Sequence, residues 1–175
     1  ISIGVDHMKY VMIQNQSVRI TGNYPNSYNS TVINNGIVDL TDESFLTFEH
    51  TDGLNYVNSE FSRVDDISKI FKINDTDKIQ ISLTEGVGAG ILYPKTNATL
   101  LGKERHDDFN VAGYGVAAKV GLNFTFYKYF FLQTELKGGY IDMNHIKTTN
   151  NAADSAAQNF WFLQRIISVG GIFKL

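Results

Sequence analysis

The 175-residue chain contains no cysteine, only two prolines and no run of basic residues. Without cysteine, neither disulfide bonds nor thiolate metal sites are available. The net charge of −3 and the lack of a basic run give no electrostatic footprint for a nucleic-acid partner. No stretch is apolar for long enough to cross a membrane as a helix. Aromatic residues are abundant instead, with 12 Phe and 9 Tyr, and they favour β-strands over helices.

Residues 112–126 alternate between two kinds of side chain. The even positions are apolar or aromatic: Ala112, Tyr114, Val116, Ala118, Val120, Leu122, Phe124 and Phe126. The odd positions between them are mostly small or polar. A period of two predicts an extended strand with two chemically distinct faces. The run exceeds the length of about 5 to 6 residues that is usual in globular strands, and it suffices for the 9 to 11 or so that cross a bilayer.

Six segments are long enough to span a membrane in this way: residues 1–12, 45–64, 78–93, 110–126, 130–143 and 159–175. They predict an all-β fold, an antiparallel transmembrane β-barrel, because an open sheet edge is not satisfied in lipid. Bacterial single-chain barrels have an even number of strands, at least about 8. We therefore expect residues 1–175 to form a single outer-membrane β-barrel domain that lacks its N-terminal strands, with two or more further strands before Ile1.

The connections between these segments predict the orientation of the barrel. Residues 127–129 form a tight turn of the kind that faces the periplasm, which makes residues 94–109 and 144–158 long extracellular loops. Residues 14–44 predict a third excursion with a hairpin, and residues 65–77 a periplasmic link with a helical turn. Aromatic residues are expected in two girdles, a lower one with Phe126, Tyr127, Tyr129 and Phe130, and an upper one with Tyr93, Tyr114, Tyr140 and Trp161.

Charged residues are expected on both faces of the sheet. The alternation places Lys119, Glu135 and Lys137 on the inner face, where Lys119 and Glu135 are expected to pair between adjacent strands. It places Glu85 on the lipid face, about midway across. A carboxylate there is costly, so Glu85 is expected to be protonated, hidden by a β-bulge or in contact with a partner protein.

The last eight residues resemble the C-terminal insertion signal of bacterial outer-membrane barrels. The pattern consists of a polar residue, a glycine and two apolar residues at the spacing of Ser168, Gly170, Phe173 and Leu175. By that resemblance, the barrel-assembly machinery would recognise this segment during insertion. The commonest form of the signal ends on Phe, whereas this chain ends on Leu175.

Nearly the whole chain resembles the outer-membrane barrels of Bacteroidota such as flavobacteria, in stretches such as "GVDHMKY" and "GVGAGILYPKTNATLLG". The resemblance implies an outer membrane of a Gram-negative bacterium, and lipid and lipopolysaccharide as surroundings. It implies no activity. The triplet Asp154-Ser155-Ala156 resembles the O-glycosylation site of that phylum, which makes Ser155 a candidate for modification, although an ordinary loop is the simpler interpretation.

Three functions agree with these features. The absence of a strong catalytic motif favours an accessory or structural barrel, with other outer-membrane proteins as partners and no cofactor or metal. The stretch around His50 resembles the histidine strand of lipid A deacylases, outer-leaflet hydrolases with a triad on the outer wall. Only His50 matches, because Asp52 stands where the nucleophilic Ser would be. The third function is a small diffusion pore, although a barrel of about 8 strands is filled by its own side chains.

Overall fold

A computed structural model of the protein describes residues 1–25, 32–41, 43–103 and 108–173. The described part of the chain is all-β except for one short helical turn. Its elements are β1 (Ser2–Val11), β2 (Ser17–Pro25), β3 (Val32–Asp39), β4 (Leu46–Asp66), η1 (Ser68–Phe71), β5 (Ile79–Leu92), β6 (Thr96–Leu100), β7 (Gly113–Phe126), β8 (Phe130–Lys147) and β9 (Ser155–Gly171). The prediction of an all-β fold is confirmed.

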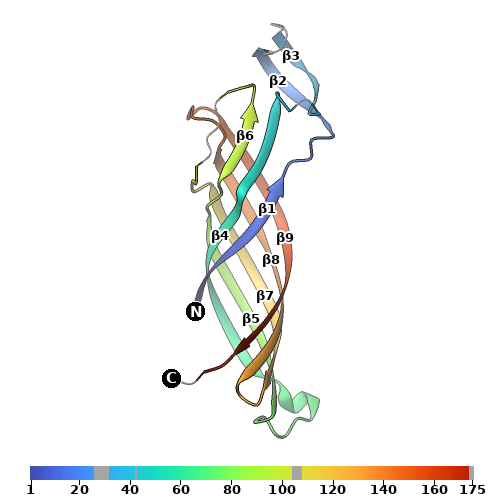
Figure 1. Cartoon of the computed structure of the whole chain (residues 1–175), viewed down its shortest axis with the longest axis vertical. Coiled ribbons are helices and arrows are strands. Elements are labelled where there is room, and N and C mark those ends of the chain that lie inside the picture. Colours follow the sequence, from blue (N-terminus) through green and yellow to red (C-terminus); the bar gives the residue numbers. More distant parts are fainter. Residues whose placement is uncertain (26–31, 42, 104–107, 174–175) are drawn as a thin grey trace.

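The long strands form one curved antiparallel sheet with the order β1-β4-β5-β7-β8-β9 (Figure 1). All six predicted spanning segments lie in it, each paired with its neighbour. The sheet is a half-barrel. Within the described residues, no hydrogen-bonded ladder joins β1 to β9, so the expected closed barrel is present only in part. Short β6 adds to β4 at the upper end, and β2 with β3 forms a separate hairpin above the sheet.

The lower connections agree with the sequence. Tyr127 and Lys128 both have positive φ, 50° and 66°, as in the two-residue turns that match the twist of a hairpin. Lys128 forms an ion pair of 2.6 Å with Asp77 on the neighbouring link. That link contains η1, and Ser68 Oγ accepts a hydrogen bond from the Ile81 backbone N–H at 2.9 Å. The predicted turn at residues 127–129 and the helical turn within residues 65–77 are therefore confirmed. The hairpin predicted within residues 14–44 is also confirmed, as β2 and β3.

The upper loops are shorter than the sequence predicts. β8 continues to Lys147 and β9 begins at Ser155, so only residues 148–154 connect them. Part of the other predicted loop is β6, which pairs with β4 from Leu46↔Leu100 to His50↔Thr96. Polar side chains made these residues look like loops, yet they extend the strands above the apolar outer surface. At the other end, β9 stops at Gly171, earlier than predicted.

The sheet has two regions with opposite chemistry. The lower region extends from the residue 127–129 turn to a level marked by the outward-facing Val5, Val57, Tyr140 and Trp161, which are register partners in two pairs. The upper region lies beyond that level and includes β6. Inner denotes the concave face of the sheet and outer the convex face.

The lower region is apolar outside and polar inside. Its outer face exposes large hydrophobic side chains, among them Ile3, Val5, Phe61, Val87, Val116, Val120, Leu136, Leu163, Ile167 and Val169. Aromatic side chains border this surface, with Tyr114 and Trp161 exposed above and Tyr127, Tyr129 and Phe130 below. The inner face carries Asn58, Glu60, Ser82, Thr84, Lys119, Glu135 and Lys137, which are largely buried. This distribution is the reverse of that in a soluble half-exposed sheet, which places its apolar face inside and its polar face outside.

In the upper region the apolar side chains lie on the inner face and the polar ones on the outer face. The inner side chains form an apolar core with Leu54, Tyr56, Leu92, Ala112, Ala117, Ile141, Met143 and Ile146, against which Met8, Phe48, Ala156, Phe160 and Phe162 pack. The outer positions switch at the same level on four strands. Val5 is followed by His7, Val57 is preceded by Asn55, Tyr140 is followed by Asp142 and Trp161 is preceded by Asn159. The upper region therefore has the apolar core and polar surface of a protein in water.

Candidate functional site

Five charged side chains form a continuous ion-pair network on the inner face of the lower region. Glu60 joins its two halves. Its Oε2 lies 2.6 Å from Lys119 Nζ, and its Oε1 lies 2.6 Å from Lys137 Nζ. Lys119 also contacts Glu135 at 3.3 Å, and Lys137 also contacts Asp6. Every charge has an opposite partner, as buried ions require.

This network crosses the concave side of the sheet. Asp6 belongs to β1 at one end of the strand order, whereas Lys137 belongs to β8, next to the other end. The contact therefore brings together strands that are far apart in the sheet and contributes to its curvature. Tyr56 covers the network from above, since Lys137 Nζ lies 5.4 Å from the centre of its ring. Cation–π contacts at this distance are attractive.

Inner glycines provide the space that the long charged side chains occupy. A Cβ atom at Gly86 would lie 2.7 Å from Ser62 Oγ and 3.1 Å from Lys119 Cε. A Cβ atom at Gly88 would lie 2.9 Å from Glu60 Cγ. The alternating glycines of β5 thus accommodate the network, and the interior at this level is filled by side chains. Such an interior favours a plugged barrel over an open pore.

The prediction that Lys119, Glu135 and Lys137 lie inside and that Lys119 pairs with Glu135 is confirmed. Sequence reasoning missed Glu60 and Asp6. Both occur at even positions of strands whose partners lie far along the chain, Glu60 facing Gly88 and Asp6 facing Tyr56. The only signal was charge complementarity, because the two inner lysines, Lys119 and Lys137, had a single predicted carboxylate partner, Glu135, and so required at least one more.

Glu85 lies on the outer face, as predicted. Its register partner Val120 is six residues from both Tyr114 and Phe126, so Glu85 is midway between the two aromatic girdles. The ladder is continuous through Glu85, which means that the chain does not bulge there. On its other side Glu85 faces Arg63 of β4, whose guanidinium also contacts Asp65 at 2.8 Å. The explanation of Glu85 by a β-bulge is therefore wrong.

His50 lies in the interior of the upper region, not on the outer wall. Only 1% of its surface is exposed, and its Nδ1 lies 3.0 Å from Thr96 Oγ1. Burial lowers the pKa of His50 to about 4, while the Gln158 side chain has a smaller opposite effect, so the imidazole is neutral at pH 7. Asp52 points away and pairs with Lys95 at 2.9 Å. These two residues do not form part of a triad on the outer wall.

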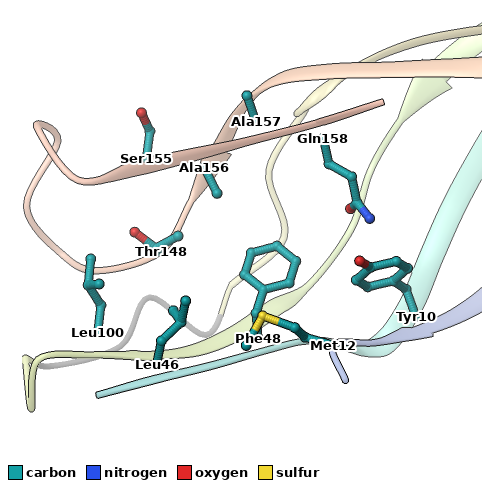
Figure 2. Close-up of a pocket in the computed structure, with 10 residues that line it drawn as sticks. All are labelled: Tyr10, Met12, Leu46, Phe48, Leu100, Thr148, Ser155, Ala156, Ala157 and Gln158. Carbon is teal, nitrogen blue, oxygen red and sulfur yellow. The ribbon is translucent and has the colours of Figure 1, made fainter. Parts of the chain in front are cut away.

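A cavity of about 350 Å³ lies beside His50 in the upper region (Figure 2). Ten residues line it: Tyr10, Met12, Leu46, Phe48, Leu100, Thr148, Ser155, Ala156, Ala157 and Gln158. They come from β1, β4, β6 and β9 and from the segments that follow β1 and β8. The Phe48 ring contacts the His50 ring edge-on at 5.3 Å, and the Tyr10 ring lies 5.8 Å from it. The cavity is thus mostly apolar and adjoins one buried polar cluster.

The remaining predicted residues lie near the ends of β9. Ser155 is exposed and begins the strand, opposite Lys147, so it is not in a loop. Next to it, the Lys103 ammonium at 2.7 Å holds the pKa of Asp154 below its usual value. In the proposed assembly signal, Ser168 and Gly170 lie on the inner face, where Gly170 leaves room for the Phe131 ring. Phe173 is 87% exposed, and Leu175 lies outside the described residues.

No helix among the described residues is long and apolar enough to cross a membrane. None of the His, Asp and Glu side chains of these residues gather in groups of three or more that would hold a metal ion.

Comparisons of the chain with protein-family models, with curated proteins and with solved structures found no match. The function must therefore be inferred from the residues and geometry described above.

Proposed function

We propose that the protein is an integral outer-membrane β-barrel of a Gram-negative bacterium that serves as an accessory or structural component of a larger membrane assembly. The membrane location is supported by the lower region, which is apolar outside, polar inside and bordered by aromatic side chains at both ends. The upper region, with its apolar core, would project into water on the extracellular side.

The observation that carries the accessory role is the pair Arg63 and Glu85. Both side chains are exposed at the middle of a mainly apolar outer surface, in adjacent positions of β4 and β5, and Arg165 of β9 is exposed in the same row of the sheet. Arg63 and Glu85 border a groove of about 380 Å³ whose other walls include Phe61, Val87 and Val120. Charged residues at the depth of lipid are costly unless they pair or face protein. A partner subunit whose polar groups enter this groove would remove that cost.

Co-purification tests the proposal. The tagged protein is extracted mildly from its own membrane and separated by blue-native electrophoresis, in parallel with Glu85→Leu and Arg63→Leu. Val87→Leu is the matched control, because Val87 lines the same groove and stays apolar. We expect a discrete large complex for the parent and the control, and its loss in both charge variants. A lone small band for the parent would contradict the accessory role.

A further inference from the structure

We infer that the cavity of the upper region is a binding site for a small uncharged molecule that is mostly apolar and carries one hydroxyl group. The site is independent of the proposed partner surface, which lies on the outer face of the lower region. It rests on the composition of the cavity wall and on buried polar atoms that adjoin the cavity.

The wall determines the apolar part of the ligand. None of its ten described residues is charged, and seven are apolar or aromatic: Tyr10, Met12, Leu46, Phe48, Leu100, Ala156 and Ala157. Ligand pockets usually measure about 300 to 1,000 Å³, so the volume of about 350 Å³ suits a small molecule. At about 30 Å³ for each water-sized group, it holds roughly ten non-hydrogen atoms. A salt or a long lipid does not match this wall.

Buried polar atoms beside the cavity indicate that the ligand carries a hydroxyl group. Among the described residues, Thr148 Oγ1 is buried and has no hydrogen-bond partner, and His50 Nε2 and Gln158 Oε1 are buried without a hydrogen bond of good geometry, although the Gln158 side chain lies close enough to raise the pKa of His50 slightly. Leaving such an atom unpaired costs about 1 to 3 kcal/mol. Thr148 and Gln158 line the cavity, and Gln158 projects toward Tyr10 and Phe48 (Figure 2). A hydroxyl group both donates and accepts, so it satisfies the Gln158 carbonyl and a second atom at once.

Fluorine NMR on the protein in lipid nanodiscs tests this inference, with three probes of one shape. They are 4-fluorobenzyl alcohol, 4-fluorotoluene without the hydroxyl, and the charged 4-fluorobenzoate, and empty nanodiscs correct for partition into lipid. We expect saturable binding of the alcohol, about tenfold tighter than either analogue, because a site with unpaired polar atoms rejects a molecule that does not pair them. Absence of saturable alcohol binding would overturn the inference.

Two variants locate the binding. Ala156→Leu reduces the cavity and should abolish saturable binding, whereas Ala152→Leu, an exposed loop position, should not. Gln158→Leu removes one unpaired carbonyl, so the protein should remain folded while the preference for the alcohol over the toluene falls to about onefold. If Gln158→Leu keeps the preference, the polar atoms pair with each other and the hydroxyl assignment is wrong. If Ala156→Leu folds and still binds, the site is elsewhere.

Discussion

The lower and upper regions of the sheet are built by the same strands, yet they place apolar side chains on opposite faces. Along β8, the inner face changes from Glu135 and Lys137 to Ile141 and Met143, while the outer face changes from Leu136 to Asp142. Neither change interrupts the ladder from Phe130 to Met143. The backbone hydrogen bonds of this ladder are therefore the same in both regions. Only the side chains change at the level where the lipid is proposed to end.

The two interiors also differ in how they treat polar groups. In the lower region every charge of the network has a partner within 3.3 Å. Among the described residues, buried polar atoms without a good hydrogen bond occur in both interiors, at Gln164 Oε1 in the lower region and at Thr148 Oγ1 and Gln158 Oε1 in the upper region, but only the latter two line a cavity of ligand size. The paired charges of the lower interior stabilise the fold, and the cavity makes the upper interior the place for the proposed ligand.

The largest effect is expected from Glu60→Leu, because Glu60 connects both lysines of the network. Removing one partner from a buried ion pair typically costs about 3 to 5 kcal/mol. We expect a loss of that size in the free energy of unfolding, measured by denaturant titration of the protein refolded in lipid vesicles. Ser59→Leu is the control, because Ser59 is adjacent but exposed on the outer face, and it should cost nothing. An equal loss in the control would show that the two faces do not differ.

The second prediction concerns acid and the upper interior. His50 accepts a proton at about pH 4 when folded and at its ordinary pKa of 6.5 when unfolded. Between pH 4 and pH 6.5 the unfolded state binds more protons than the folded state. The contribution of neutral His50 to the stability of the fold is therefore complete above pH 6.5 and disappears as the pH falls to 4. The difference corresponds to roughly 3 kcal/mol. We expect His50→Gln to remove this part of the pH dependence, measured as parent minus variant. A parallel pair of curves would contradict a neutral buried imidazole.

The sequence predicts β7 and β8 well because both faces of these strands keep one character between residues 118 and 137. Ala112 is an exception, since the alternation groups it with the exposed Tyr114 but it is buried in the core of the upper region. The sequence also predicts the ion pair of Lys119 and Glu135, which needs only the register of one tight hairpin. Local information suffices there.

For β4, the alternation in the sequence does not predict which side chains face inward, and the reason is physical. This strand of 21 residues passes through both regions, so the apolar residues change from the inner face, at Phe48 and Leu54, to the outer face, at Val57 and Phe61. Its alternation therefore looks mixed, and a register shift between His50 and Leu54, where Gly53 has a φ of 82°, interrupts it further. The role of Glu60 and the inward position of His50 depend on pairing with β1, β5 and β6, which a single strand does not encode.

The third prediction probes the outer face. Ala118 lies in the lower region, between Val87 on β5 and Gly138 on β8, and Ala118→Lys would place a charge on the face that we propose contacts lipid. Lysine on the lipid side of a barrel costs about 2 to 4 kcal/mol at the midplane and less toward the interfaces, so we expect a loss of about 2 kcal/mol in vesicles. Asn144→Lys, exposed in the upper region, should have little effect. Equal effects at both positions would argue against the proposed membrane boundary.

The smallest effect is expected at the point where the interior changes character. Gly139 lies on the inner face between Lys137 and Ile141, and a Cβ atom there would lie 2.4 Å from the Val116 carbonyl oxygen and 2.6 Å from Phe162 Cε1. Gly139→Ala therefore overpacks the junction of the two interiors, and we expect a loss at the low end of the usual range, about 1 kcal/mol. Gly138→Ala is the neighbouring control, since its Cβ would meet Leu163 Cδ1 at an ordinary 3.5 Å on the outer face. The Cβ atoms at these two positions would point to opposite faces, so a loss at Gly139 alone would show that the inner face is tightly packed where the charged interior meets the apolar one. Similar losses at both would mean that the strand itself, and not the junction, is sensitive to substitution.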